Sequence, residues 1–264
     1  MKLQVLLSAM FLEDEGYVDS LNITTDAVVI NQCDRSASRI VKRNNINNDE
    51  HTITYIESTE RGLSRSRNLA IKNATGDICI LCDNDVEYLD DYESRILDAF
   101  IRHEDADLIV FYIKRKEKPK PNYDSARLMD YLSVLKIFSP EIAFRRKSIE
   151  GISLNEDFGA GAKYIMGEEN IFLYDCIKKG LKIYYEPVQI ASLREEESTW
   201  FKGYNEIFFI SRGANYAAMS KCMSYLLILQ FAIRKRYLYK DNMSMWQALN
   251  LMNKGRREYL KSIK

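Results

Sequence analysis

The chain has 264 residues, is 46% apolar and 11% aromatic, and carries 38 basic and 38 acidic side chains, so its formal net charge is zero. This length can bury a substantial core, and the composition, with eleven glycines and four prolines, excludes a disordered, collagen-like or low-complexity chain. The balanced charge removes the simplest argument for a nucleic-acid-binding protein, and we expect no nucleic-acid partner.

The N-terminal residues lack the cationic head and the cleavage site of a signal peptide, and no apolar run reaches the roughly 20 residues that span a bilayer. Five cysteines are an odd number, and the CxxC pair Cys79 and Cys82 lies inside an apolar run without a second pair. We therefore expect a cytoplasmic protein without a disulfide framework or a zinc site.

Short apolar runs alternate with helical patterns through the first half of the chain. The runs that predict strands are Leu3–Leu7, Ala27–Ile30, Thr52–Ile56, Ile78–Cys82 and Leu108–Ile113. Several are apolar throughout, which is typical of strands buried on both faces of a parallel sheet. Helices are predicted at Ser64–Ala74 and after Asp90. The alternation predicts an open α/β sheet, in which ligands bind at the carboxyl ends of the strands.

The pattern changes after Ile113. Lys114–Asp124 is polar and predicts an exposed loop, and Asn155–Gly167 is a second, glycine-rich loop. The latter leads into a predicted helix that begins near Glu168 and stops at Gly180. Ile183–Tyr185 predicts one more strand, and the pattern is helical from Thr199 onward.

The strongest chemical signal is the tripeptide Asp83-Asn84-Asp85, which ends an apolar run. Two carboxylates two residues apart can converge on one divalent cation, and such a cation binds the oxygens of a diphosphate. An isolated tripeptide of this kind is more typical of a turn. Its position at the end of a predicted central strand favours a ligand site.

A second signal is the segment ERGLSRSRN from Glu60 to Asn68, which holds Arg61, Arg65 and Arg67 at the start of a predicted helix. Guanidinium groups beside a helix N-terminus suit an anionic ligand. The alternative is a solvated basic first turn. Both interpretations stay open from this segment alone.

Three more acidic residues are candidates. Glu168 or Glu169, at the start of a helix, would take a proton from an attacking hydroxyl, although the helix dipole favours acids there without any function. Asp34, in NQCD after the second predicted strand, would bind a nucleobase or ribose, or form a polar exit from the strand. In an open parallel sheet, the carboxyl ends of the strands share one edge. We expect four of the candidate residues to lie there: Asp34, Arg67, Asp83 and Asp85.

Taken together, these segments resemble the family 2 glycosyltransferases with the GT-A fold, especially bacterial enzymes of capsular and O-antigen polysaccharide synthesis. The resemblance is carried by KLQVLLSAM, NQCD, ERGLSRSRNLAI, ICILCDNDVEY with its DxD motif, GEENIFLYDCIKKGLKIYYEP and ESTWFKGYNEIFFISRGA. It implies a Rossmann-like, mostly parallel sheet flanked by helices in residues 1–215. Residues 1–113 would be the nucleotide-binding half, 114–215 the acceptor half, and 216–264 a C-terminal helical extension.

The resemblance implies a metal-dependent hexosyltransferase that uses a UDP-sugar donor. Asp34 would contact the uracil, and Arg61 and Arg67 would lie near the nucleotide. The DxD segment with Asn84 would lie at the diphosphate, where Asp83 and Asp85 would hold Mn²⁺ or Mg²⁺.

The same resemblance assigns the catalytic base to Glu169, with Glu168 as the neighbouring candidate. The base would deprotonate a hydroxyl of the acceptor. The acceptor would be a saccharide, and the polysaccharide context that the resemblance implies favours one linked to a lipid. Direct attack on the anomeric carbon would invert its configuration. The metal and the arginines would stabilise the charge on the departing diphosphate.

One position departs from the family pattern. Leu193 stands where many relatives carry a histidine that contributes to the metal or phosphate site. Water and phosphate oxygens would then complete the metal shell, or metal dependence would be weak, with Arg194 as a substitute positive charge. This departure keeps open a nucleotide-sugar-binding protein without turnover. A nucleotidyltransferase, a class that also favours α/β sheets and paired carboxylates, is the second alternative.

The C-terminal segment is strongly basic. Cys222–Ile233 is almost wholly apolar, and from Arg234 to the end nine basic residues stand against two acidic ones. Such a segment would lie on the inner face of the cell membrane, with basic side chains near anionic headgroups. A core helix that packs on the sheet, or a contact between copies in a homo-oligomer, is the slightly favoured alternative.

Overall fold

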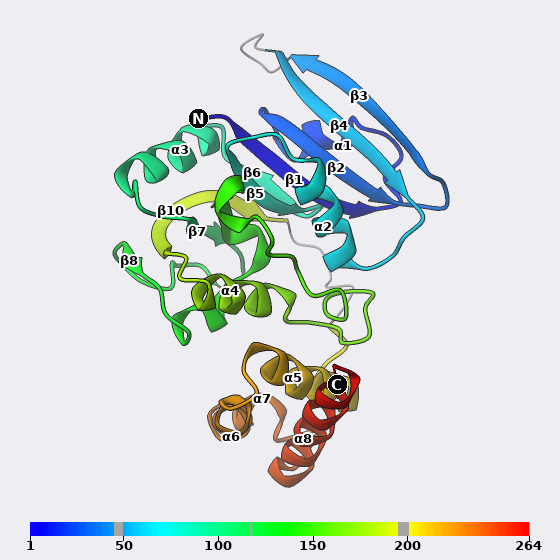
Figure 1. Ribbon diagram of the computed structural model, residues 1–264, viewed down its shortest axis with the longest axis vertical. Coiled ribbons are helices and arrows are strands. Elements are labelled where there is room, and N and C mark those ends of the chain that lie inside the picture. The colour runs from blue at the N-terminus through cyan, green and yellow to red at the C-terminus, as the bar shows by residue number, and fades with distance from the viewer. Residues whose placement is uncertain (45–49, 117, 195–200, 264) are drawn as a thin grey trace. The chain divides into compact units, whose positions relative to one another are not determined.

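The computed structural model describes residues 1–44, 50–116, 118–194 and 201–263 (Figure 1). The chain divides into two compact units. Unit 1 comprises Met1–Arg61, Arg65–Ser153 and Cys176–Glu196, and unit 2 comprises Gly62–Ser64, Leu154–Asp175 and Glu197–Lys264. The division of the chain into a nucleotide half, an acceptor half and an extension is a functional one, and it stays a prediction.

Unit 1 is built on one sheet. In the described part of the chain the strand order is β3-β4-β2-β1-β5-β9-β7-β10-β6, and β8 pairs with β10. The strands are β1 (Leu3–Met10), β2 (Asp26–Gln32), β3 (Ala37–Asn44), β4 (Glu50–Ser58), β5 (Ile78–Asp83), β6 (Val86–Tyr88), β7 (Leu108–Lys114), β8 (Arg127–Leu128), β9 (Ile142–Arg145) and β10 (Ile183–Leu193).

The centre of the sheet is parallel. β1 pairs in parallel with β2 and with β5, β2 pairs with β4, and β7 pairs with β10. β1, β2, β5 and β7 are buried along nearly their whole length, which explains their continuous apolar sequences. The predicted α/β fold with a central sheet is confirmed. The sheet is mixed because β3, β6, β8 and β9 join it in antiparallel pairs.

Helices cover both faces of this sheet. On one face, α1 (Tyr17–Ser20) and α3 (Tyr92–Arg102) contribute to a core cluster together with alternate side chains of β1, such as Val5 and Leu7. On the other face, α2 (Leu63–Asn73) approaches β1, where Ser66 Oγ lies 2.8 Å from Ser8 Oγ. The short 3₁₀ helices of unit 1 are η1 (Ser133–Lys136), η2 (Ser139–Glu141) and η3 (Arg146–Ile149).

The helix predicted after the glycine-rich loop is α4 (Glu168–Lys178). Gly180 terminates the helix, and its φ of 82° is a left-handed conformation that glycine adopts without strain. The N–H of Gly180 donates to the carbonyl of Ile177, and the N–H of Leu181 donates to that of Cys176. These two hydrogen bonds are typical of a Schellman motif, and they confirm the predicted stop.

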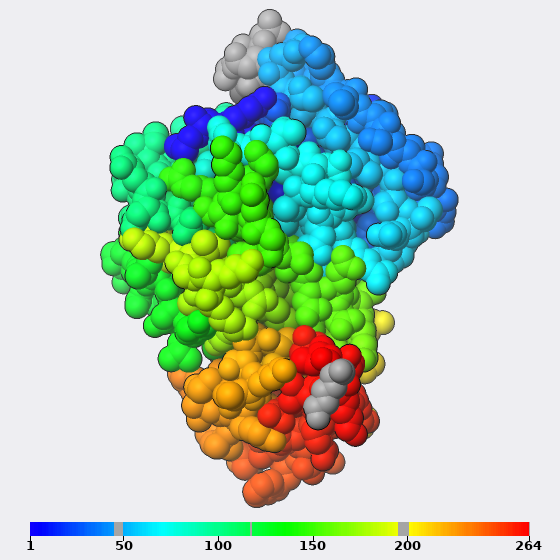
Figure 2. Space-filling view, viewed as in Figure 1, coloured from blue at the N-terminus to red at the C-terminus, as the bar shows by residue number. Residues whose placement is uncertain are grey.

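Unit 2 contains the C-terminal helices α5 (Glu206–Met219), α6 (Ser224–Arg234), α7 (Arg236–Tyr239) and α8 (Met245–Ser262). They are coloured gold to red and pack against one another (Figure 2). The side chain of Asn205 caps α5, and Ser244 with Gln247 forms a capping box at α8. The predicted helical start at Thr199 lies outside the described residues. None of the described helices has the length and apolar character needed to cross a membrane.

Two glycines let α5 and α8 approach each other closely. A Cβ atom on Gly213 would lie 1.8 Å from the carbonyl oxygen of Met252, and one on Gly255 would lie 1.9 Å from that of Ile210. In both cases the obstacle is backbone and cannot rotate away. The helices therefore cross at a point where no larger residue fits.

Candidate functional site

The acidic tripeptide forms the turn between β5 and β6, and two neighbours hold its backbone. The hydroxyl of Tyr17 donates to the carbonyl of Asn84 at 2.9 Å, and the N–H of Arg194 donates to the carbonyl of Asp85 at 2.8 Å. Cys82, directly before the turn, is fully buried, and burial raises the pKa of its thiol. The thiol therefore stays protonated at neutral pH.

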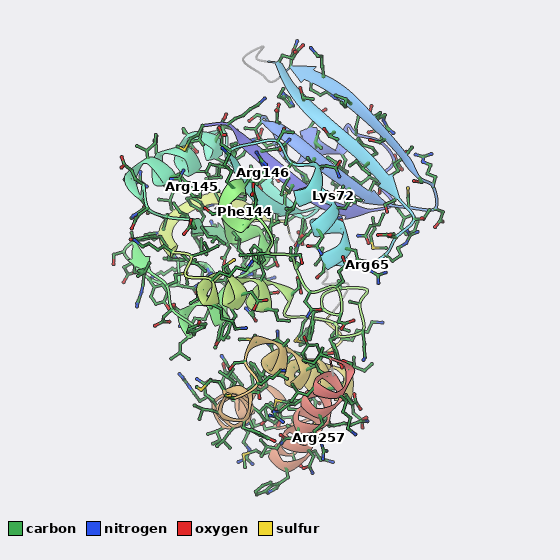
Figure 3. All side chains as sticks on the ribbon, in the orientation of Figure 1. Arg65, Lys72, Phe144, Arg145, Arg146 and Arg257 are labelled. Carbon is green, nitrogen blue, oxygen red and sulfur yellow. The ribbon has the colours of Figure 1, made fainter. Side chains whose placement is uncertain are left out.

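Arg67 links α2 to this turn. Its Nη2 donates to Asp83 Oδ1 at 2.8 Å, and the arginine is only 1% exposed. Asp83 is the register partner of Ser8 across β1 and β5, so the pair lies over the carboxyl ends of these central strands. An ion pair with a buried arginine fixes the orientation of the carboxylate, which is itself 22% exposed. Arg65 and Lys72 lie on the same helix and are both exposed (Figure 3).

A second ion pair lies at the end of β2. Arg61 Nη2 donates to Asp34 Oδ1 at 2.6 Å, and Arg61 Nη1 donates to the carbonyls of Cys33, Ser58 and Thr59. Arg61 thus ties together the chain segments that follow β2 and β4. The side chain of Asp34 is 87% exposed and can accept hydrogen bonds from a ligand.

Phe11 is a feature of this edge that sequence analysis missed. It follows β1, is 57% exposed, and has a φ of 52°, which is unusual for a residue other than glycine. The Cζ atom of Arg61 lies 5.3 Å from the centroid of its ring. An exposed ring beside a guanidinium group and a carboxylate offers a flat surface to a nucleobase. A single exposed aromatic residue after a strand gave no signal that distinguishes it in the sequence.

Leu193, the departure from the family pattern, lies in β10 opposite Val86 of β6 and packs on the apolar core. It therefore contributes no ligand beside the acidic turn. The neighbouring Arg194 donates from Nε to Glu87 Oε2 at 3.2 Å and from Nη2 to the carbonyl of Ser20. These contacts use the guanidinium group that was considered as a substitute charge.

The start of α4 is fixed from within unit 2. Gly167, with a φ of 91°, turns the chain into the helix, and its carbonyl accepts a hydrogen bond from Asn215 Nδ2 of α5 at 2.8 Å. Asn215 is fully buried, and a Cβ on Gly167 would lie 2.2 Å from its Nδ2. Asn215 is a second residue that the sequence did not reveal, because its partner is a distant backbone carbonyl.

The two acids at this helix start differ in their surroundings. Glu168 is 5% exposed, and a Cβ on Gly159 of the glycine-rich loop would lie 3.3 Å from its Oε2. Glu169 is more accessible. Of the two carboxylates, Glu169 is the one that a ligand from solvent reaches more readily.

The donor set at the acidic turn fits a cation only in part. In the described ranges, no group of three or more His, Cys, Asp or Glu side chains is placed to hold a metal ion. Asp83 is paired with Arg67 through Oδ1, and Asp85 is the second carboxylate of the turn. Mg²⁺ and Mn²⁺ accept one or two carboxylates when phosphate oxygens and water complete the shell. The residues therefore fit a cation that binds together with a nucleotide.

The predicted residues thus fall into three local groups. Asp34 and Arg61 form one, and Arg67, Asp83, Asn84 and Asp85 form another; both lie in unit 1. The register of β1 with β2 and β5 places these two groups at the same edge of the sheet. Glu168 and Glu169 form the third group and belong to unit 2.

Solved structures similar to this chain include complexes with nucleotide sugars. S. aureus TarS 1-349 in complex with UDP-GlcNAc has a TM-score of 0.63 at 13% identity, covering 100% of this chain and 82% of that one. The mannosyltransferase PcManGT from Pyrobaculum calidifontis, in complex with GDP-Man and Mn²⁺, has a TM-score of 0.52 at 13% identity, covering 99% and 75%. At these identities the similarity shows the fold alone.

The sequence comparison goes further than the fold. No curated protein matches the chain. The sequence model described as Glycosyl transferase family 2 matches residues 25–160, just over half of the chain, and this range includes Asp34, α2 and the acidic turn. The expected resemblance is thereby confirmed: the chain belongs to glycosyl transferase family 2.

Proposed function

We propose that this protein transfers a sugar from a UDP-sugar to a hydroxyl of a saccharide acceptor, with inversion at the anomeric carbon. The observation that carries the proposal is the gathering of Asp34–Arg61 and Arg67–Asp83 at the carboxyl edge of the parallel strands. Ligands of open α/β sheets bind at that edge. TarS, a similar structure, was solved with UDP-GlcNAc, and we extend this class of donor to the chain.

In this proposal the donor is held by unit 1. Asp34 accepts a hydrogen bond from the uracil, and the ring of Phe11 packs on the base. Arg61 and Arg67 supply positive charge near the nucleotide, and Arg67 also fixes Asp83. Because these groups are set by backbone and ion-pair contacts, they need little rearrangement when the donor binds.

The chemical step needs a base and a stabilised leaving group. We assign the base to Glu169 because it is more accessible than Glu168. Glu169 accepts the proton of the acceptor hydroxyl, whose oxygen forms a bond to the anomeric carbon while the bond from that carbon to the diphosphate oxygen breaks. The electron pair leaves with UDP. Attack from the opposite face inverts the configuration.

A divalent cation, Mn²⁺ or Mg²⁺, would be held by Asp85 with Asp83 and would neutralise charge on the diphosphate. The test is thermal unfolding with a panel of UDP-sugars, with and without Mn²⁺. We expect one of the UDP-sugars to raise the midpoint temperature of unfolding. We expect Mn²⁺ to increase this rise in the wild type but not in Asp85→Ala. An equal effect of Mn²⁺ on both proteins would remove the metal from the proposal.

The wider context is also part of the proposal. Residues 1–113 bind the nucleotide, 114–215 the acceptor, and 216–264 form the helical extension. The acceptor is a lipid-linked saccharide of surface polysaccharide synthesis, which would place the enzyme at the cytoplasmic face of the membrane. The polar loop between β7 and β8 and the glycine-rich loop before α4 are the segments we expect to meet the acceptor.

The packing of the partly buried Leu193 against the core favours one rival, a nucleotide-sugar-binding protein without turnover. Assays of UDP release with and without a panel of saccharide acceptors separate the two functions. A transferase releases UDP faster when an acceptor is present. A protein that only binds the donor releases none under either condition.

A further inference from the structure

The helix α6 is apolar on two faces, and only one of them is buried. Its buried residues are Ser224, Leu227, Ile228 and Ala232. The residues Tyr225, Leu226, Leu229 and Ile233 are between 47% and 59% exposed, and we call them the α6 face. Their spacing places them within about 100° of one another around the helix axis. They form a continuous apolar stripe on the surface of unit 2.

This stripe is unusual for a surface helix. The exposed side of such a helix normally carries charged and polar residues, because only the opposite stripe faces the core. Single exposed apolar residues are common and need no explanation. A contiguous row of them is typical of a surface that binds another protein or a membrane. The core of unit 2 already accounts for the buried stripe of α6.

The charges in Lys221–Lys240, the segment that carries the α6 face, all have one sign. From Lys221 to Lys240 the chain carries five basic residues and no acidic one. Arg234, Lys235 and Arg236 follow the stripe directly at the end of α6, and all three are exposed. Arg256 of α8 lies over the ring of Tyr225, with its Cζ 3.7 Å from the centroid, and donates to the tyrosine hydroxyl.

We infer that the α6 face docks on the surface of an anionic phospholipid bilayer. An interfacial helix places apolar side chains at the boundary of headgroups and acyl chains while basic residues contact anionic headgroups. Exposed Tyr225 and Tyr237 suit that boundary, where aromatic residues with a polar end are enriched. The inference goes beyond the proposed reaction, and vesicle binding needs neither donor nor acceptor.

Charge complementarity favours lipid over a second copy of the chain. A symmetric dimer through the α6 face would bring two clusters of basic residues together without an acidic partner in Lys221–Lys240. An anionic bilayer attracts each basic residue near its surface by about 1 kcal/mol, which is roughly fivefold in affinity. The same cluster that opposes self-association therefore strengthens binding to lipid.

The experiment is cosedimentation of the full chain with vesicles. We expect binding to phosphatidylcholine vesicles that contain about one third phosphatidylglycerol, and much weaker binding to pure phosphatidylcholine. Raising the salt concentration from ~0.1 M to ~0.5 M should weaken binding to the vesicles that contain phosphatidylglycerol. The double variant Leu226→Ser with Leu229→Ser should lower the partition coefficient by about tenfold or more. Replacing Arg234, Lys235 and Arg236 by Gln should lower it by at least about tenfold.

Leu128→Ser with Leu132→Ser is the matched control, because these two exposed leucines lie in unit 1. We expect wild-type binding from it. Absence of binding by the wild type, or equal binding by the wild type and the α6 double variant, would overturn the inference. Sedimentation velocity supplies the other decisive outcome: a wild-type dimer that the double variant dissociates would assign the α6 face to a second copy. If the double variant does not fold, the charge variant and the salt series decide.

Discussion

Arg67 of α2 and Asp83 of β5 form an ion pair at 2.8 Å in which the arginine is almost completely buried. The pair joins a helix to the end of a central strand, directly before the two remaining residues of the acidic turn. Sequence analysis placed Arg67 near a nucleotide and Asp83 at a metal. The structure shows that each is the partner of the other. In the proposed function, Asp85 would therefore be the main carboxylate ligand of a bound cation.

Removal of the Arg67 side chain should therefore affect stability as well as donor binding. We expect Arg67→Ala to lower the free energy of unfolding by about 3 kcal/mol, because it leaves the Asp83 carboxylate without its buried partner. The measurement is urea denaturation at neutral pH. Lys72→Gln on the same helix is the control and should change stability by less than about 0.5 kcal/mol. Equal effects of the two substitutions would show that the pair contributes little.

Asp34 should matter for binding and little for stability. Its side chain is exposed, so its ion pair with Arg61 contributes at most about 1 kcal/mol to folding. If it accepts a hydrogen bond from the uracil, Asp34→Ala should weaken UDP binding by about tenfold. Titration calorimetry with UDP measures this, with Glu60→Ala as the control for loss of an exposed negative charge. Unchanged affinity in Asp34→Ala would move the nucleobase elsewhere.

The glycines at the crossing of α5 and α8 should be irreplaceable. Gly255→Ala forces a Cβ atom against the carbonyl of Ile210, and overpacking of this kind costs about 1–3 kcal/mol. Gly16→Ala is the matched control, because the atom nearest to its Cβ is the movable carboxylate of Asp14. Urea denaturation of both variants checks the prediction. A Gly255→Ala protein as stable as Gly16→Ala would mean that the two helices can separate without loss.

Stability should fall at alkaline pH. Burial raises the pKa of the Cys79 thiol from 9.0 to about 12 and that of the Tyr92 phenol from 10.0 to about 12. The unfolded chain therefore loses these protons before the folded chain does, and the stabilisation present below about pH 9 declines as the pH rises toward 12. Urea midpoints between about pH 8 and 10.5 should decrease. Cys79→Ala should make the decrease of the urea midpoint with pH less steep. Cys222→Ala, at an exposed cysteine, should leave that decrease unchanged.

Much of the fold could be predicted from the sequence because the parallel strands are buried on both faces. The apolar runs in β1, β2, β5 and β7 predicted strands, and the structure confirms a strand at each of them. β3 was missed because its exposed and partly buried residues alternate in a polar sequence. β9 was missed because only four residues, Ile142–Arg145, form it, and its place between β5 and β7 depends on pairing that no local pattern records.

The candidate site was predictable where several chemical groups are adjacent in sequence. The acidic turn and the arginine-rich start of α2 stood out for that reason. Phe11, Tyr17 and Asn215 did not, because each acts through a residue far away in the chain or through a backbone carbonyl. The pairing of Arg67 with Asp83 is likewise a consequence of how α2 packs on the sheet, and periodicity alone does not specify it.

The central claim, that Glu169 accepts the proton of an acceptor hydroxyl, is tested most directly by UDP release from Glu169→Gln. With a donor and an acceptor that the wild type uses, we predict a turnover lower by ~100-fold or more and a Kd for UDP within about twofold of the wild type. Glu168→Gln, tested in parallel, should retain more activity. Turnover of Glu169→Gln close to that of the wild type would contradict the account.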